Sequence, residues 1–187
     1  PLMLVGQGVE LAGARQELLA LCEKAQIPFG QTMLGLSAAP TGHPLNMGML
    51  GMHGNLAPNV MTNQCDLLIA VGMRFDDRVT GDLHTYAKQA KVIHFEIDPS
   101  EVGKIVKPTV AVLGNCKQTL AQVTELVEPA RHQAWIDGFK PYAEKEYNKV
   151  IDAALNPKDG PLLMGEVVRR VSEAANNEAI MVTDVGQ

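Results

Sequence analysis

The chain has few aromatic residues, few cysteines, no long hydrophobic run and no excess of positive charge. None of its apolar stretches reaches about 18 residues, so we expect no membrane span, and no signal-peptide pattern opens the chain. The three cysteines are scattered and odd in number, which argues against disulfides or a cysteine metal site and favours a reducing compartment, the cytoplasm. The net charge of −5 argues against a nucleic-acid binder.

Apolar residues make up 46% of the chain, mostly as aliphatic side chains and methionine. Short continuous apolar runs alternate with segments of helical periodicity, which is typical of a parallel sheet covered by helices. The sequence therefore predicts an α/β fold with a doubly wound, mostly parallel sheet and helices on both faces. The predicted strands are residues 2–5, 27–32, 66–71, 92–97 and 110–113; the predicted helices run from the Gly6-Gln7-Gly8 turn to about residue 25, over 57–63, and around 120–127.

Three parts are expected along the chain: the main domain (1–128), a charged connecting segment with a helical pattern (129–160), and the opening of another α/β domain (161–187). Because the chain begins at the edge of a strand and stops inside a strand-to-helix turn, we expect it to be a piece of a longer polypeptide.

Within the last part, Pro161 suits the first turn of a helix. The apolar stripe of that helix would be Leu163, Val167 and Val171, and a strand is predicted over 179–183.

The most informative segment is the decapeptide of residues 72–81, Gly-Met-Arg-Phe-Asp-Asp-Arg-Val-Thr-Gly, which directly follows a predicted strand. Ligands of open α/β sheets bind outside the carboxyl ends of the strands, and burying four unpaired charges in a core would be costly. Arginine guanidinium groups suit phosphate, so the decapeptide predicts a site for a dinucleotide-like ligand. The alternative is a surface loop whose charges pair with one another.

Two other strand ends carry weaker signals. Gly6-Gln7-Gly8 could offer free N–H groups to a phosphate. It is not the dinucleotide fingerprint, because Leu11 stands where a third glycine would be, and a simple tight turn is an equal alternative. Glu96 could accept hydrogen bonds from ribose hydroxyls, whereas Asp98 is better explained as the cap of a short helix.

The sequence shows no local catalytic set and no metal-binding set. The five histidines form no short-range pair with a carboxylate or a cysteine. His94 is expected in the core, and His53, in the long Gly/Pro/Met-rich loop of residues 35–54, is the histidine best placed for a ligand. The same loop carries clustered methionines that favour an adaptable apolar wall: Met47, Met49 and Met52.

Five segments spread along the chain form a set: Thr32-Met33-Leu34-Gly35-Leu36, Leu50-Gly51-Met52-His53-Gly54, Arg74-Phe75-Asp76-Asp77-Arg78-Val79-Thr80-Gly81, His94-Phe95-Glu96-Ile97-Asp98 and Thr183-Asp184-Val185-Gly186-Gln187. Together they resemble the large, catalytic subunit of the acetohydroxyacid synthase (acetolactate synthase) family. The run from Arg74 to Gly81 is the most specific of them.

The resemblance implies a subunit of three α/β domains that uses thiamine diphosphate, Mg²⁺ and FAD and joins two pyruvates, or pyruvate and 2-oxobutanoate, in branched-chain amino-acid biosynthesis. This chain would be the Rossmann-like central domain, which holds FAD without a net redox role, plus the connection to the diphosphate-binding domain. Homodimers or tetramers, with or without a regulatory subunit, are expected. The alternatives are a sister enzyme (pyruvate oxidase or glyoxylate carboligase), against which the decapeptide argues, and a stand-alone nucleotide-binding module, against which the ending inside a turn argues.

The resemblance also implies site residues, carried over by matching position. The flavin site would comprise Gly6, Gln7, Gly8, Thr32, Met33, Leu34, Met52, His53, Gly54, Gly72, Arg74, Asp76, Arg78, Val79, Glu96, Ile97, Gly114, Asn115 and Cys116. Members of the family often have Asp at the position of Asn115. Gln187 would contact thiamine diphosphate, whereas the activating glutamate is expected before Pro1 and the Gly-Asp-Gly metal motif beyond Gln187.

Asp77 and Arg78 are expected at the substrate channel. Adjacent residues of an extended chain point in opposite directions, so if Asp76 faces the flavin, Asp77 would face elsewhere. The resemblance implies that it faces the channel, with Arg78 serving both sides.

Overall fold

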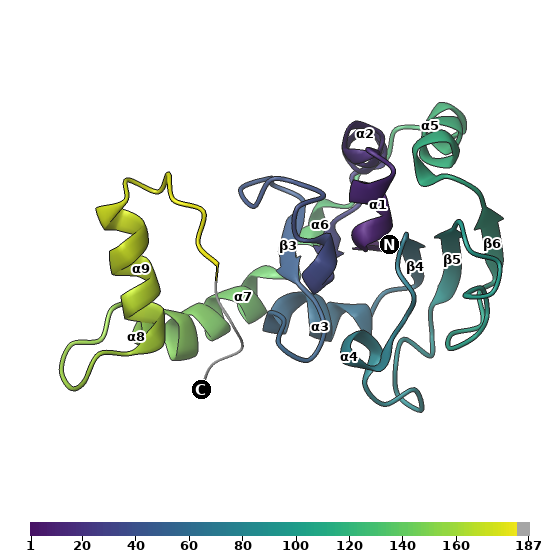
Figure 1. Ribbon diagram of the computed structural model, residues 1–187. Helices are drawn as coiled ribbons and strands as arrows, with labels where there is room; N and C mark the ends of the chain where they lie inside the picture. The colour runs from purple at the N-terminus through teal and green to yellow at the C-terminus, as the bar shows by residue number, and fades with distance from the viewer. Residues whose placement is uncertain (183–187) are drawn as a thin grey trace. The chain divides into compact units, whose positions relative to one another are not determined.

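The structure, a computed structural model, describes residues 1–182 and contains two compact units (Figure 1). The first unit, Pro1–Ala143, is an α/β domain. The second begins at Glu144, and its described part is helical.

The first unit is built on one six-stranded sheet whose strands all run parallel. The strand order is β3-β2-β1-β4-β5-β6, so the chain winds outward from β1, returns to the centre and winds outward again from β4. This order is that of doubly wound dinucleotide-binding sheets, and it confirms the predicted fold class. The strands are β1 (Leu2–Val5), β2 (Phe29–Gln31), β3 (Asn46–Met49), β4 (Leu67–Val71), β5 (Lys91–Glu96) and β6 (Val110–Leu113).

Alternating side chains of the central strands fill two core layers, one on each face of the sheet. On β1, Met3 and Val5 face one layer and Leu2 and Leu4 face the other, and all four are fully buried. Three helices cover the first layer, and Figure 1 shows two of them, α2 and α5, side by side above the sheet: α1 (Gln7–Leu11), α2 (Arg15–Ala25) and α5 (Cys116–Leu126). The helix α3 (Leu56–Thr62) covers the second layer.

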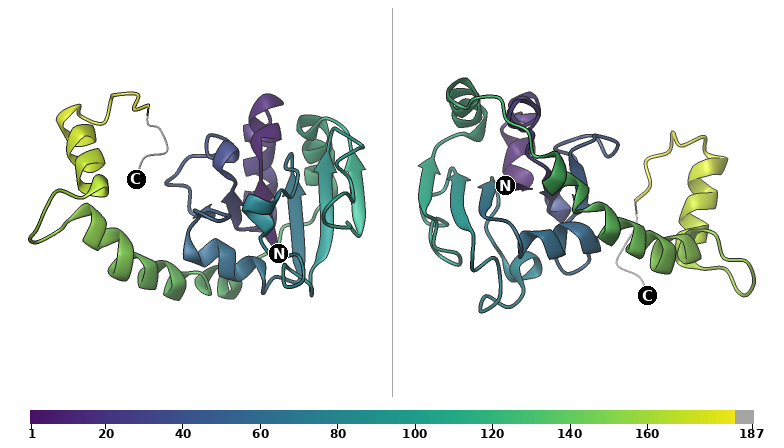
Figure 2. Two further views of the ribbon diagram at one scale, coloured as in Figure 1. Left: turned by 60° about the horizontal axis from the view of Figure 1, so that its bottom comes forward. Right: turned by 180° about the vertical axis from the view of Figure 1, so that it is seen from behind.

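After α5 the chain crosses to the face covered by α3, as Figure 2 shows. There α6 (Gln133–Asp137) is followed by Phe139, which is buried in the second layer, with the Trp135 ring edge-on at 5.6 Å. Gly138 lies against Met61 of α3. The sequence after residue 128 therefore contributes to the core of the first unit.

Two elements of the first unit differ from the prediction. The single helix predicted up to residue 25 is two helices, because the chain turns at Gly13, whose φ is +61°. The predicted loop of residues 35–54 contains the edge strand β3 and is preceded by a short 3₁₀ helix, η1 (Met33–Gly35). All four β3 residues are half-buried, so no alternation marks this strand, and Asn46 fixes it by donating to Gln31 Oε1 at 2.9 Å.

The second unit is a short helical hairpin. The π-helix η2 (Tyr147–Ile151) follows α7 (Lys140–Glu146), and then come α8 (Asp152–Leu155) and α9 (Met164–Ala174). Arg169 of α9 donates to the Leu155 carbonyl at 2.9 Å, which ties the two arms of the hairpin together.

Two predictions for this unit are wrong in the described residues. Pro161 lies in the loop before α9 and not in its first turn, because the helix begins only at Met164. Residues 179–182 form no strand, since no described strand pairs with them, and an unpaired strand lacks its ladder of hydrogen bonds. Thr183 and the segment up to Gln187 lie outside the described residues.

Candidate functional site

The predicted site lies at the carboxyl edge of the sheet, where β1 and β4 flank the point at which the strand order reverses. Ligands of doubly wound sheets bind at this switch point. Gly6 and Gly72 follow these two strands, and backbone hydrogen bonds join their turns: Gly6 N to Val71 O (2.9 Å) and Gly8 N to Gly72 O (3.0 Å). The structure therefore brings the glycine turn and the decapeptide together.

These glycines permit a close approach of two backbones. A Cβ on Gly6 would overlap the Gly72 carbonyl oxygen, and a Cβ on Gly8 would lie 2.7 Å from Gly72 Cα. Gly72 also has a φ of +59°. The tight-turn interpretation of Gly6 and Gly8 is thus satisfied by geometry, and the same packing leaves the switch point free of side chains from these positions.

The decapeptide ends in a single helical turn, α4 (Asp77–Thr80), capped by Asp76, whose Oδ1 accepts from Arg78 N at 3.0 Å. Its charges form two long, exposed pairs: Arg74–Asp76 at 3.8 Å and Arg78–Asp77 at 3.5 Å. Exposed pairs of this kind contribute about 0–1 kcal/mol. The guanidinium groups are therefore weakly held, and a phosphate could bind them with little loss of stability from the broken ion pairs.

The extended-chain argument for Asp77 is wrong, because Asp77 is the first residue of α4 while Asp76 is its extended N-cap. Asp77 is nevertheless well exposed, and its side chain meets Arg78, whose Nη1 lies 3.5 Å from Asp77 Oδ2. The direction of the Asp77 side chain is set by this helical turn and not by strand alternation.

The long loop is held against the decapeptide. Met52 N donates to the Arg78 carbonyl at 2.7 Å, and Asn59 of α3 clamps Gly51 by accepting from its N–H and donating to its carbonyl, both at 2.9 Å. The residues Met52, His53 and Gly54 thus lie beside α4. Sequence reasoning missed Asn59, and its position inside a predicted helix gave no signal of this role.

Glu96 is a largely buried carboxylate, 7% exposed, at the carboxyl end of β5. Its Oε1 accepts from the N–H groups of Ile97 (2.8 Å) and Asp98 (3.2 Å), and its Oε2 lies 3.7 Å from His94 Nε2. Asp98 caps a turn and not a helix, since it accepts from the Ser100 N–H and hydroxyl, and these bonds hold the pKa of Asp98 below its usual value.

Beneath the decapeptide lie residues that sequence reasoning did not connect with it. His94 is fully buried, as predicted, and its Nε2 is 2.8 Å from the Met73 carbonyl oxygen. Phe75 is buried with a φ of +56° and packs edge-on against His94 and Tyr86. The place of His94 inside a predicted strand indicated a core position, but its contact with Phe75 depends on the tertiary fold and leaves no mark in the sequence.

Large apolar side chains are exposed at the same edge. Each of four predicted site residues is more than half exposed: Met33, Leu34, Met52 and Ile97. They follow β2, β3 and β5, and Thr32 N donates to the Val5 carbonyl at 2.9 Å, which holds the first of these turns beside β1. Exposed apolar side chains beside charged ones suit a ligand with an apolar ring and a phosphate end.

The β6–α5 turn reaches the glycine turn through one side chain. Cys116 Sγ donates to the Gly8 carbonyl at 3.4 Å, and burial raises the pKa of this thiol. Asn115 is the N-cap of α5, and its Oδ1 accepts from Lys117 N at 2.9 Å, a bond that Asp could equally make. Gly114, with φ +149°, donates to the Glu96 carbonyl at 3.0 Å.

Of the remaining predicted residues, Gln7 is exposed at the start of α1 and Val79 is half-buried in α4. Gln187 lies outside the described residues. Within residues 1–182, no group of three His, Cys, Asp or Glu side chains could hold a metal ion. No helix in this range is long and apolar enough to cross a membrane.

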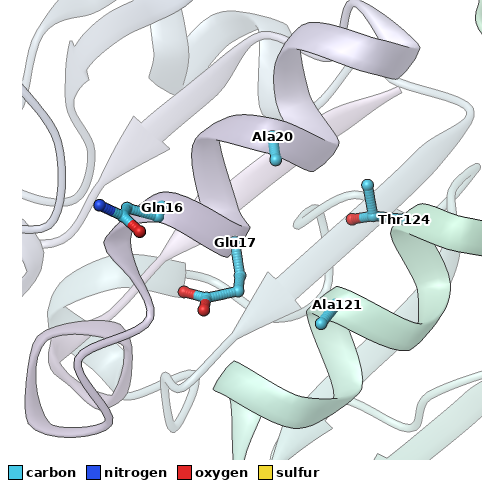
Figure 3. Close-up of a pocket in the computed structure, with 5 residues that line it drawn as sticks. All are labelled: Gln16, Glu17, Ala20, Ala121 and Thr124. Carbon is cyan, nitrogen blue, oxygen red and sulfur yellow. The ribbon is translucent and has the colours of Figure 1, made fainter.

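A shallow groove of about 300 Å³ lies away from the predicted residues, between α2 and α5 (Figure 3). Glu17 is its one charged residue, and Lys117 Nζ lies 3.9 Å from Glu17 Oε1. The lining residues are Gln16, Glu17, Ala20, Ala121 and Thr124. Two alanines and one long ion pair offer little chemistry, so this groove does not compete with the carboxyl edge.

Known proteins similar to this chain support the resemblance found in the motifs. The whole chain is 42% identical to the acetolactate synthase large subunit of Parasynechococcus marenigrum, 38% to the acetolactate synthase isozyme 1 large subunit of Escherichia coli and 37% to the probable acetolactate synthase large subunit of Methanocaldococcus jannaschii. These alignments cover 100% of this chain but 30%, 32% and 32% of the relatives, so the chain spans about a third of the length of the curated relatives it matches.

The family model for the thiamine pyrophosphate enzyme central domain matches residues 1–123, which contain all six strands and every predicted flavin-site residue. The match, the parallel sheet and the similarity along the whole chain agree with one another. The chain therefore belongs to the family of thiamine pyrophosphate enzyme central domains.

Proposed function

We propose that this chain is the central, FAD-binding part of an acetolactate synthase large subunit. The whole enzyme would condense two pyruvates, or pyruvate and 2-oxobutanoate, with loss of CO₂. One observation carries the proposal: the glycine turn after β1 and the arginine-bearing decapeptide after β4 lie side by side at the switch point of the sheet. The named relatives do not favour pyruvate oxidase, glyoxylate carboligase or a stand-alone module.

The residues at the carboxyl edge fit a flavin dinucleotide. Arg74 and Arg78 would pair with its diphosphate, because the ion pairs that they form within the decapeptide are long and exposed and therefore weak. Glu96 would accept from ribose hydroxyls through Oε2, since backbone N–H groups occupy Oε1. The exposed apolar residues, Met33, Leu34, Met52 and Ile97, would contact the ring system.

The other predicted flavin residues would line the edges of the same site. They lie in the turns that follow the strands, near the arginines, Glu96 and the exposed apolar residues. They are Gly6, Gln7, Gly8, Thr32, His53, Gly54, Gly72, Asp76, Val79, Gly114, Asn115 and Cys116. Asp77 and Arg78 would face the incoming 2-oxoacid, whose carboxylate the Arg78 guanidinium suits.

The whole subunit would use thiamine diphosphate and Mg²⁺ as well as FAD. Thiamine diphosphate would supply the nucleophilic carbon of the condensation, and Gln187 would contact it. Residues 1–128 would form the FAD domain and 161–187 the opening of the diphosphate-binding domain. Residues 129–160 would be the connection, and its first part packs into the core of the first unit. The enzyme would be a homodimer or tetramer in the cytoplasm, with or without a regulatory subunit, and the three free cysteines suit that compartment.

Flavin titration of the whole subunit tests the proposal. Replacing Arg74 with alanine should weaken FAD binding by about 1.5–3 kcal/mol, the range for hydrogen bonds to charged groups. Arg131→Ala is the matched control, because Arg131 is exposed and follows Ala130, which donates to Lys24 O at the far end of α2. An unchanged FAD affinity for Arg74→Ala would return Arg74 to the role of a surface ion pair.

A further inference from the structure

Phe75 has an unusual backbone for its residue type. Its φ of +56° lies in the left-handed region, which side chains other than Gly, Asn and Asp rarely adopt. The side chain is 1% exposed and is held edge-on by two rings, His94 at 5.1 Å and Tyr86 at 6.5 Å. Such strained residues persist only where the surrounding structure holds them, and they cluster at ligand-binding segments.

His94 holds the same turn through a hydrogen bond. Its Nε2 lies 2.8 Å from the Met73 carbonyl oxygen, and because a carbonyl only accepts, Nε2 must carry the proton. Nδ1 is buried without a hydrogen-bond partner in the described part of the chain. A buried nitrogen without a hydrogen bond destabilises the fold. An apolar side chain at residue 94, like that of Val92 two positions earlier on the same face of β5, would stabilise the core more.

The two anchors flank Arg74. The Met73 carbonyl is fixed by His94 on one side and the Phe75 ring is buried on the other, whereas the Arg74 side chain is exposed. The same imidazole lies 3.7 Å from Glu96 Oε2. One buried side chain therefore links the segment that carries Arg74 to the carboxylate at the end of β5.

We infer that His94 is a positioning residue: it fixes the Met73–Phe75 turn so that Arg74 faces the FAD diphosphate. This inference rests on the proposed flavin site and adds to it a residue that touches no cofactor. It acts through the backbone, so its effect on FAD binding depends on Arg74.

The test replaces His94 in the whole subunit with amide side chains of different length. The FAD affinity of each variant is measured by titrating the apoprotein with FAD. His94→Gln can place an amide N–H near the former Nε2 and should keep FAD affinity within about threefold of the parent. His94→Asn is equally polar but too short to reach Met73 O, and it should lose about tenfold, the equivalent of one hydrogen bond. Val92→Ala is the control, because it disturbs the same face of β5 but leaves the hydrogen bond of His94 to the Met73 carbonyl in place, and it should bind FAD as the parent does.

A double-mutant cycle separates this inference from the proposed function. In an Arg74→Ala background, His94→Asn should have less than about a twofold further effect, because the residue through which it acts is gone. If Arg74→Ala weakens FAD binding but His94→Asn does not, the inference is wrong and the flavin site stands. If Arg74→Ala has no effect, the diphosphate role of Arg74 fails and the inference fails with it. Equal losses of FAD affinity for His94→Gln and His94→Asn would show that His94 acts only through packing in the core, and the inference would be wrong.

Hydrogen exchange of the 187-residue chain gives a second readout that needs no flavin. His94→Asn should speed exchange of the Gly72 and Arg78 amides, which flank the turn and donate to Phe95 O and Asp76 Oδ1. His94→Gln and Val92→Ala should leave both unchanged. Unchanged exchange at both Gly72 and Arg78 in His94→Asn would overturn the inference.

Discussion

Gly72 is a residue at which space and backbone conformation both require glycine. Its φ is +59°, and a Cβ there would lie 2.7 Å from Gly8 Cα. Gly13 has nearly the same φ, +61°, but a Cβ on it would meet nothing within 4 Å. Comparing substitutions at Gly72 and Gly13 therefore distinguishes the cost of the left-handed conformation from the cost of forcing the two turns apart.

We predict that Gly72→Ala lowers the free energy of unfolding of the first unit by about 2–4 kcal/mol, since strain and overpacking add. Gly13→Ala should lower it by about 1–2 kcal/mol, from strain alone. Urea unfolding followed by circular dichroism measures both. Equal losses at the two positions would mean that the β1 and β4 turns separate easily.

Asp77 tests whether the decapeptide has a role besides the FAD binding that we propose for it. Because Asp77 is exposed at the start of α4, Asp77→Ala should change the unfolding free energy by no more than about 0.5 kcal/mol. In the whole enzyme it should raise the apparent KM for pyruvate several-fold, or change the choice of the second 2-oxoacid, with FAD content near normal. Loss of FAD with unchanged substrate kinetics after reconstitution would reverse the assignment.

At the scale of elements, continuous apolar runs predicted the strands well. The bounds of β1 and β6 match the predicted ranges, and β4 and β5 shift by a single residue at one or both ends. The edge strand β3 was missed because its residues, Asn-Met-Gly-Met, show neither alternation nor a buried run, and its place depends on the Asn46–Gln31 bond. Strand ends converge on one edge, so the glycine turn, the decapeptide and Glu96 could be predicted from the sequence pattern. Most other candidate site residues came from the family resemblance, whereas Asn59, Phe75 and Tyr86 act through contacts between distant segments.

The loop after β3 depends on α3. Asn59 makes three hydrogen bonds, to Gly51 N, Gly51 O and Asn55 O. We predict that Asn59→Ala lowers the unfolding free energy by about 1–3 kcal/mol and speeds hydrogen exchange over residues 50–54. Gln118→Ala, on the exposed face of α5, is the control and should change neither quantity. Protection of residues 50–54 that survives Asn59→Ala would show that Met52 and Arg78 suffice to hold the loop.

At the scale of the whole molecule, the chain covers the thiamine pyrophosphate enzyme central domain and about a third of the length of its relatives. The condensation requires an activating carboxylate and a diphosphate-anchoring metal besides the thiamine ring. We predict that the 187-residue polypeptide forms no acetolactate from pyruvate, even with all cofactors added, and that it binds FAD weakly or not at all. A colorimetric acetolactate assay measures this, and turnover above background would show that the active site has been misplaced.

The central place of β1 has a consequence for how the sheet forms. Met3 pairs with Phe29 on one side and with Ile69 on the other, so β1 precedes both of its partners and the second lies far along the chain. Pairings between distant segments are slow to form, because the entropy of closing a long loop must be lost before any contact compensates for it. The two halves of the sheet, β1–β3 and β4–β6, can each assemble from nearer segments. We therefore expect their joining along β1 and β4 to be the late step of folding, and this step creates the switch point of the sheet.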